Sequence, residues 1–308
     1  MKRYSIGFDI GGTNIAAAMY DEKYDEVSRL SVPFPKDSDV YAVSKLLSTM
    51  KDSLAAEVDK KEIKGVGIAV PGSIDSKGEI VIDAHNLGFF DAPLLKAAKE
   101  CMSGIEVAML NDANAATLAE FNKGVLFGCD TGALLTLGTG VGGGLILNGR
   151  LFNGGRGSGV EMGHMIIAQD GEKCTCGNSG CAEALCSATW LISQGRRNFE
   201  GMIKEAADGN KENVSAKTVI DCAKAGDKTA AAIFEKYVDS LGSLVASIIN
   251  LTDAQVIAVG GGVSGAGEFL FEPLRENVHK KCFFRTHGDI LPAKLGNDAG
   301  MLGAALYI

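Results

Sequence analysis

One pattern constrains the fold of this chain more than any other, and it occurs twice: an apolar strand, a glycine-rich turn and a second apolar strand. The first copy is "YSIGFDIGGTNIAAAMYD" at residues 4–21, and the second is "ALLTLGTGVGGGLIL" at residues 133–147. Apolar runs joined by a short glycine turn are typical of β-hairpins. The repeat predicts two related halves, each of which presents a glycine loop.

Helical and strand-like segments alternate through the rest of the chain. Helices are predicted near residues 40–58, 94–102, 113–124, 216–225, 229–250 and 268–280, and further strands near 63–70, 106–111 and 254–260. This alternation predicts an α/β architecture with largely parallel or mixed sheets. Because no linker is rich in proline or serine, we expect a compact domain crossing near residue 113. The small domain would be 1–113, with the C-terminal helix 297–308 packed back on it, and the large domain 114–296.

Composition and charge narrow the function. The 308 residues are 46% hydrophobic and 22% charged, which is normal for a globular protein with a sizeable core. The net charge of −8 argues against nucleic acid or an anionic membrane surface as the main partner. The first apolar run meets Asp9 too early for a signal peptide, so we expect a cytoplasmic protein. In that compartment clustered cysteines more often bind metal or do chemistry than form disulfides.

Three glycine clusters follow apolar strands, at residues 11–12, 138–144 and 260–262. Glycine lets backbone N–H groups approach phosphate oxygens without a Cβ in the way. Tight turns alone would explain any single cluster, but three at strand ends favour nucleotide binding. The "GTGVGG" stretch matches the dinucleotide fingerprint, yet a strand rather than a helix follows it, which excludes that mode. The chain also lacks a P-loop motif and a serine-hydrolase elbow.

Two aspartates each stand at the end of a predicted strand. Asp112 follows "EVAML", the position from which an open α/β sheet presents side chains to a ligand. Aspartate also caps helices well, and from spacing alone a cap for the helix that follows is the favoured interpretation. Asp9 ends its own strand in the same way, where turn chemistry is its ordinary role.

Three of the eight cysteines, Cys174, Cys176 and Cys181, form a C-x-C-x4-C cluster. The first two are too close for an easy disulfide, and a redox pair would more usually be C-x-x-C. Three thiolates need one further ligand for tetrahedral zinc, and His164 is the nearest of the four histidines. The cluster therefore predicts a zinc site, and the five other cysteines are expected to be buried or inert.

Six stretches, in this order, resemble the ROK family of sugar kinases within the actin-like ATPase superfamily. They are "DIGGTN" (9–14), "LNDANAA" (110–116), "LGTGVGGG" (137–144), "GVEMGHM" (159–165), "CTCGNSGCAE" (174–183) and "VGGGVS" (259–264). The resemblance implies an actin-like (ribonuclease H-like) fold with two domains around a nucleotide and sugar cleft. Two further stretches, "NDANAATLAE" and "GVSGAGEFLFEPL", look most similar to bacterial glucokinases of the family. The family's repressors carry a DNA-binding segment before the first glycine loop, and only eight residues precede that motif here.

The resemblance also implies roles for individual residues. The aspartate of the N-D motif, Asp112, would be the general base for the sugar hydroxyl. The implied sugar ligands are Gly72, Asn86, Asn111, Asp112, Glu161, His164 and Glu183. The implied nucleotide and Mg²⁺ contacts are Asp9 (through water), Gly11, Gly12, Thr13, Asn14, Gly138, Thr139, Gly140, Gly261 and Gly262. The implied zinc ligands are His164, Cys174, Cys176 and Cys181.

Some of these implications have ordinary alternatives. For each of the two glutamates, Glu161 and Glu183, the ordinary alternative is a solvated charge on the protein surface. His85 stands where related sequences often have proline, which is a departure in the sugar-side loop.

The implied activity is ATP-dependent phosphorylation of a hexose at the 6-hydroxyl, with glucose as the expected sugar and ATP, Mg²⁺ and Zn²⁺ as cofactors. The alternatives are another ROK hexose kinase, for N-acetylmannosamine, fructose or allose, and a catalytically inactive sugar-sensing protein. The intact Asp9 and Asp112 argue against the inactive alternative. A homodimer is expected, with no nucleic-acid or membrane partner.

Overall fold

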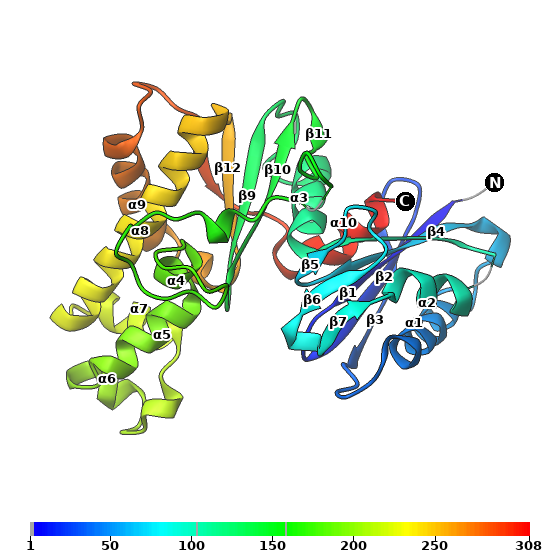
Figure 1. Ribbon diagram of the computed structural model, residues 1–308, viewed down its shortest axis with the longest axis horizontal. Helices are drawn as coiled ribbons and strands as arrows, with labels where there is room; N and C mark the ends of the chain where they lie inside the picture. The colour runs from blue at the N-terminus through cyan, green and yellow to red at the C-terminus, as the bar shows by residue number, and fades with distance from the viewer. Residues whose placement is uncertain (1–2, 103, 158) are drawn as a thin grey trace. The chain divides into compact units, whose positions relative to one another are not determined.

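The computed structural model describes residues 3–102, 104–157 and 159–308. Its internal contacts divide the chain into two compact units (Figure 1). The first unit contains Met1–Phe127, Arg150–Val160 and Leu295–Ile308, and the second contains Gly128–Gly149 and Glu161–Lys294. Compared with the crossing expected near residue 113, the first unit extends through helix α3 (Asp112–Lys123). The C-terminal helix α10 (Ala299–Leu306), which we expect to pack on the small domain, belongs to this unit.

A five-stranded mixed sheet with the order β3-β2-β1-β4-β8 forms the centre of the first unit. Its strands are β1 (Tyr4–Ile10), β2 (Asn14–Tyr20), β3 (Glu26–Pro33), β4 (Ile63–Val70) and β8 (Glu106–Asn111). The β1–β2 hairpin is antiparallel, as predicted, whereas β1, β4 and β8 run parallel. The carboxyl ends of these three parallel strands therefore meet at one edge of the sheet, where ligands of open α/β sheets bind.

Alternating side chains along β1 explain how the sheet is covered. Ile6, Phe8 and Ile10 belong to the core that also contains the buried residues of α1 (Val40–Leu54) and α2 (Leu94–Cys101). On the other face, α10 packs together with α3. A Cβ at Gly7 or Gly67 would collide with backbone carbonyls of α10, so this helix rests directly on the backbone of the sheet.

A second, three-stranded sheet in the first unit was missed by the sequence prediction. It consists of β5 (Ser73–Ile74), β6 (Val81–Ala84) and β7 (Phe89–Ala92), joined in that order. All three strands are antiparallel and at most four residues long, too short for a clear alternation of apolar and polar residues.

The second unit is built around four strands in the order β10-β9-β12-β13. They are β9 (Gly132–Leu137), β10 (Val141–Leu147), β12 (Val256–Gly260) and β13 (Asp289–Pro292), and the two-residue strand β11 (Arg150–Leu151) belongs to a segment of the first unit. The predicted second hairpin is present as β9–β10, and β12 runs parallel to β9. The glycine clusters at 138–144 and 260–262 thus follow the carboxyl ends of neighbouring strands.

Six α-helices of the second unit complete the predicted α/β class. They are α4 (Glu183–Cys186), α5 (Ala188–Arg197), α6 (Gly201–Ala206), α7 (Ala216–Lys224), α8 (Lys228–Thr252) and α9 (Glu268–Lys281). Short 3-10 helices in the two units are η1 (Lys60–Glu62), η2 (His85–Leu87), η3 (Met162–His164), η4 (Lys211–Asn213), η5 (Gly262–Ala266) and η6 (Gly296–Asp298).

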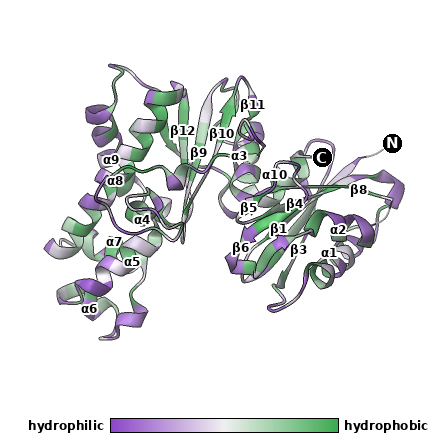
Figure 2. Cartoon of the chain, viewed as in Figure 1, coloured by the Kyte–Doolittle hydropathy of each residue, from purple (hydrophilic) through white to green (hydrophobic). Residues whose placement is uncertain are grey.

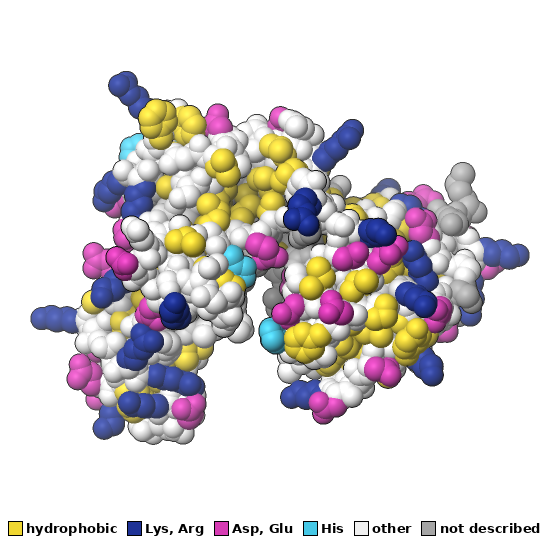
Figure 3. Space-filling view, viewed as in Figure 1, with side chains coloured by type: hydrophobic (Ala, Val, Ile, Leu, Met, Phe, Trp, Pro, Cys, Tyr) yellow, Lys and Arg dark blue, Asp and Glu magenta, His cyan; other side chains and the backbone are white. Residues whose placement is uncertain are grey.

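Hydrophobic residues concentrate on the central strands, such as β1 and β12, while helices such as α6 and α9 carry hydrophilic residues (Figure 2). In the part of the chain that the structure describes, no helix has the length and apolar character needed to cross a membrane. Positive and negative side chains are interspersed over the face shown in Figure 3.

Candidate functional site

Asp112 is the first residue of α3, and its neighbour Asn111 is the N-cap. The Asn111 Oδ1 accepts hydrogen bonds from the backbone N–H groups of Ala113 at 2.9 Å and Asn114 at 3.1 Å. The capping role that spacing alone favoured for Asp112 therefore belongs to Asn111. The Asp112 Oδ1 also accepts a hydrogen bond from the Ala113 N–H at 2.7 Å.

The electrostatics of the first unit single out two carboxylates. Burial raises the pKa of Asp112, although the Ala113 N–H opposes this shift. Burial, together with the charge of Asp112, raises the pKa of Asp9 to about 6. Two interacting carboxylates with raised pKa values at the carboxyl edge of a sheet are typical of sites that move protons or bind cations.

The first glycine loop lies next to Asp9. The Gly11 N–H donates to the carbonyl of Asn14 at 2.9 Å, which closes the turn between β1 and β2. A Cβ at Gly12 would lie 3.1 Å from the carbonyl oxygen of Asn86. The first glycine loop therefore contacts η2, which contains this implied sugar ligand. Thr13 and Asn14 are exposed beside it.

Gly72 and Asn111 are joined directly. Gly72 has a φ of +87°, and a Cβ there would collide with the carbonyl of Asp83, so only glycine fits. The Asn111 Nδ2 donates to the Gly72 carbonyl at 2.9 Å. The Asn111 amide is thus engaged at both ends.

His85, the departure noted in the sequence, begins η2 beside Asn86. Its Nε2 lies 3.4 Å from the Asp83 Oδ2, and its ring meets the exposed ring of Phe90 edge-on, with 5.1 Å between centroids. A proline at this position could make neither contact.

A hollow of about 270 Å³ lies beside β8 in the first unit. Asn111 and Asn114 both line it. The Asn114 side chain is 6% exposed, and its buried Oδ1 has no hydrogen-bond partner among the described residues. Sequence reasoning did not identify this residue, although it stands within the "LNDANAA" motif.

The predicted zinc ligands converge in the second unit. One ligand atom from each of His164, Cys174, Cys176 and Cys181 can be chosen so that all four lie within 4.8 Å of one another. The Cys174 Sγ is 3.6 Å from the His164 Nδ1, and the Cys176 and Cys181 sulfurs are also 3.6 Å apart. Tetrahedral zinc with Zn–S bonds of about 2.3 Å separates its sulfur ligands by about 3.8 Å, so the residues fit this metal.

The protonation of the sulfurs also bears on metal binding. Hydrogen bonding, first from the backbone of Asn178, lowers the pKa of Cys176 to about 7, whereas burial raises that of Cys181 to about 12. Because zinc binds thiolates, loading the site releases protons. Of the five other cysteines, Cys129, Cys186 and Cys222 are buried, and burial raises the pKa of each.

The second glycine loop connects to the region that follows the cysteine cluster. The Val141 N–H donates to the Glu183 Oε2 at 3.0 Å, and a side chain at Gly140 would collide with that carboxylate. Gly261, with a φ of +83°, packs on the backbone of Leu137, while Gly262 faces open space. Glu161 is exposed just before η3. The sequence did not predict the Glu183 contact, because it joins residues 42 positions apart.

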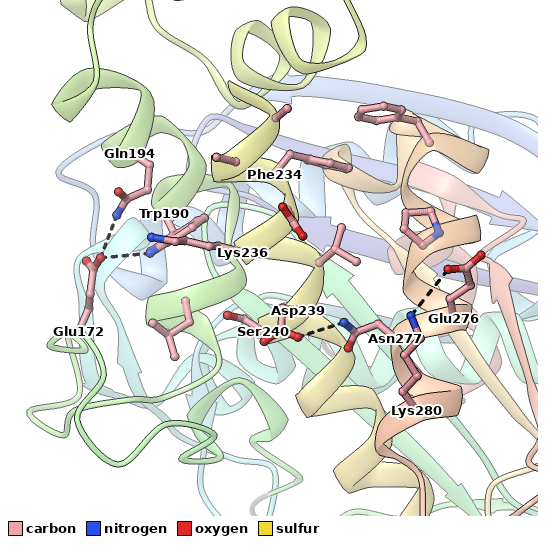
Figure 4. A pocket seen from close by; sticks show the side chains of 17 residues that line it. Glu172, Trp190, Gln194, Phe234, Lys236, Asp239, Ser240, Glu276, Asn277 and Lys280 are labelled. Carbon is pink, nitrogen blue, oxygen red and sulfur yellow. Dashed lines mark hydrogen bonds and ion pairs between the residues drawn. The ribbon is translucent and has the colours of Figure 1, made fainter. Parts of the chain in front are cut away.

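A larger hollow in the second unit, of about 910 Å³, lies between α5, α8 and α9 (Figure 4). Trp190, Phe234 and Phe269 contribute its aromatic walls. At one end Glu172 accepts hydrogen bonds from the Trp190 Nε1 at 3.2 Å and the Gln194 Nε2 at 2.8 Å. None of the residues predicted to bind nucleotide, sugar or metal lines this hollow.

Comparison with known proteins agrees with these features. The profile of the ROK family matches residues 5–308. A glucokinase of Thermotoga maritima is 35% identical, over 98% of this chain and 96% of that protein, and an N-acetylmannosamine kinase of Escherichia coli is 33% identical, over 98% and 97%. A crystal structure of a ROK glucokinase from Streptomyces griseus, in complex with glucose and AMPPNP, is 31% identical and matches with a TM-score of 0.83 over 99% of this chain and 98% of that one.

These matches extend over nearly the whole chain and bear out the predicted actin-like fold. The chain belongs to the ROK family.

Proposed function

We propose that this protein transfers the γ-phosphoryl group of ATP to the 6-hydroxyl of D-glucose, giving ADP and glucose 6-phosphate. The observation that carries the proposal is Asp112: a carboxylate at the carboxyl end of β8, with a raised pKa and with helix capping left to its neighbour. Identity of 31–35% to glucokinases over almost the full length supports glucose as the sugar.

In this proposal Asp112 accepts the proton of the 6-hydroxyl as the hydroxyl oxygen attacks the γ-phosphorus. The bond between the γ-phosphorus and the bridging oxygen breaks at the same time, and ADP leaves. A raised pKa makes the ionised carboxylate a better base than an ordinary aspartate. Positioning and charge neutralisation supply the rest of the rate enhancement.

The nucleotide contacts are divided between the two units. Asp9, Gly11, Gly12, Thr13 and Asn14 are the proposed contacts from the first unit. Gly138, Thr139, Gly140, Gly261 and Gly262 are the proposed contacts from the second. Bound Mg²⁺ would neutralise phosphate charge, and the Asp9 oxygens suit such a hard cation, directly or through water.

The sugar contacts combine side chains with a metal-braced loop. Gly72, Asn86 and Asn111 are the proposed contacts from the first unit, and Glu161, His164 and Glu183 from the second. The His164 Nδ1 faces Cys174, which leaves its Nε2 for a sugar oxygen when zinc is bound. Zinc in this proposal holds the loop that orients the imidazole and the two glutamates.

N-acetylmannosamine is the second candidate substrate. It is favoured by the 33% identity to the N-acetylmannosamine kinases, which cover the chain as fully as the glucokinases do. We also propose that the protein assembles as a homodimer, which light scattering after size-exclusion chromatography would test directly. A monomeric mass at micromolar concentration would refute the dimer without affecting the catalytic proposal.

The experiment for the catalytic proposal is an ADP-release assay with Mg²⁺-ATP and zinc-loaded protein, run across glucose, fructose, allose, mannose and N-acetylmannosamine. We expect glucose to give the highest rate, with the product identified as the 6-phosphate by NMR. Release of ADP that no hexose stimulates would refute the proposal.

A further inference from the structure

The turn between β9 and β10 is held from one side by the start of α5. The Thr189 hydroxyl donates to the carbonyl of Thr139 at 2.7 Å, and the Ala188 N–H donates to the carbonyl of Gly138 at 2.8 Å. All four residues belong to the second unit. Thr189 is exposed, so its hydroxyl would otherwise have bonded to water.

These two bonds fix the direction of two successive peptide groups. In a trans peptide the carbonyl of one residue and the N–H of the next point in opposite directions. Because the Gly138 and Thr139 carbonyls are turned toward α5, the N–H groups of Thr139 and Gly140 are turned away from it. Neither N–H donates to an acceptor among the described residues. Two such adjacent N–H groups form a concave anion-binding group.

The chain that precedes α5 also contacts the turn between β9 and β10. Glu183, the first residue of α4, accepts the Val141 N–H at 3.0 Å. The zinc-ligand candidate Cys181 lies only two residues before Glu183. The stretch from Glu183 to Thr189 thus bonds to the glycine turn at three points and connects it to the cysteine cluster.

We propose that Thr189 is a positioning residue for the phosphates of ATP: its hydroxyl orients the Thr139–Gly140 peptide so that the N–H groups face the phosphate oxygens. This inference rests on the proposed ATP-dependent function. It adds a residue outside the glycine turn, which the sequence motifs did not mark, because the contact joins positions 50 residues apart. Thr189 does not touch the reacting atoms and acts only through the turn.

The test replaces the hydroxyl while keeping the shape of the side chain. Thr189→Val removes the donor, and Thr189→Ser keeps it. Loss of one such hydrogen bond should weaken binding of AMPPNP with Mg²⁺, measured by calorimetry, by about three- to tenfold. The KM for ATP should rise in parallel, while the KM for the hexose should change by less than about twofold, and Thr189→Ser should restore both nucleotide values.

The matched control is Thr252→Val, because the Thr252 hydroxyl also donates to a backbone carbonyl, that of Ile248 at 2.7 Å, at the far end of α8. It should leave nucleotide binding unchanged. Thr189→Ala is a second donor-free variant in case the valine perturbs the turn, and thermal unfolding shows whether each variant is folded. Wild-type affinity for AMPPNP in both folded donor-free variants would overturn the inference, as would equal losses in nucleotide and hexose KM.

This outcome is separable from failure of the proposed function. AMPPNP binding requires no hexose turnover, so it can be compared between variants even if no sugar is phosphorylated. If the wild type phosphorylates glucose but Thr189→Val and Thr189→Ala bind AMPPNP normally, only the role of Thr189 is wrong.

Discussion

At the scale of single residues, Asn111 and Asp112 have separate roles, and this separation decides which chemistry the site can perform. The Asn111 side chain accepts hydrogen bonds from the first N–H groups of α3, so the cap of this helix does not depend on the Asp112 carboxylate. An ionisable group that is placed at a ligand edge and is not needed for the helix is available for chemistry.

Asp112→Asn keeps the shape of the side chain but removes the proton acceptor. We expect kcat to fall about 10²–10⁴-fold, because that is the usual contribution of a general base. The dissociation constant for glucose, measured by calorimetry, should change far less. Asp208→Asn, the same substitution at an exposed turn position, should behave like the wild type. Near-normal turnover by Asp112→Asn would assign the base elsewhere.

Asp9 gives a prediction for stability against pH. Its pKa is about 6 in the folded protein and 3.8 ordinarily, so the folded state binds this proton more tightly than the unfolded state. The stabilisation that this tighter proton binding gives to the folded state is complete below pH 3.8 and is lost as the pH rises through about 6. Asp9→Asn should therefore raise the free energy of unfolding at neutral pH, on the order of 2 kcal/mol.

Urea unfolding at about pH 7.5 and about pH 5, without added Mg²⁺, measures this effect. The gain from Asp9→Asn should be clearly smaller at the lower pH, because the native carboxyl is then largely protonated. An equal gain in unfolding free energy at both pH values, or a loss of stability at neutral pH, would contradict this prediction. It would show that burial and the charge of Asp112 do not destabilise the ionised Asp9 carboxylate.

At the scale of elements, the cysteine cluster brings together the ligand atoms of His164 and three cysteines. Purified protein should contain about one zinc per chain by elemental analysis. Cys176→Ala should lose the metal and most of the activity, because Glu161, His164 and Glu183 lose their common anchor. The far-UV circular dichroism should stay close to that of the wild type, since two sheet cores lie outside the loop.

Cys282→Ala is the control for this variant, because that cysteine also lies in the second unit but belongs to no metal-ligand group among the described residues. It should keep both zinc and activity. Native protein that is free of metal yet fully active would refute the proposed role of zinc.

The packing of α10 on the first sheet gives a second prediction at this scale. Gly67→Ala would place a methyl group against the backbone carbonyl of Ala304, and relieving the collision requires the helix to shift. We expect a loss of about 1–3 kcal/mol in the free energy of unfolding by urea. Gly155→Ala, where a Cβ would meet no atom within 4 Å, should be neutral. Equal stability of the two variants would mean that α10 does not rest on the sheet.

The sequence predicted many of the elements but missed others, among them strand β3 and helices α5 and α6. The strands of both glycine-turn hairpins and the helices α7 to α9 lie where their apolar periodicity placed them. The strands β5 to β7 were not predictable, because they are too short to show an alternation of apolar and polar residues. The bonds of Glu183 and Thr189 to the glycine turn were not predictable either, because they join positions 42 and 50 residues apart, which leaves no local pattern. The cap of α3 was assigned one residue too late, since Asn and Asp are about equally good caps.

At the scale of the whole molecule, the candidate residues are shared between two units, each with its own glycine loop and its own sugar-side groups. The proposed function assigns the recognition of ATP and of the hexose to residues of both units. Sugar selectivity then depends on many polar groups at once, because a hexose that leaves one buried group unpaired loses about 1–3 kcal/mol. We expect this summed penalty to separate glucose from its competitors.

The preference for glucose can be measured by competition between sugars in one vessel. Equal concentrations of glucose, fructose and N-acetylmannosamine are incubated with limiting Mg²⁺-ATP, and the sugar phosphates are quantified by NMR, so that their ratio gives the ratio of kcat/KM values. We expect glucose 6-phosphate in at least about tenfold excess over either other product, since one unpaired polar group is worth about that factor. Predominance of N-acetylmannosamine 6-phosphate, or of a glucose phosphate other than the 6-isomer, would contradict this expectation.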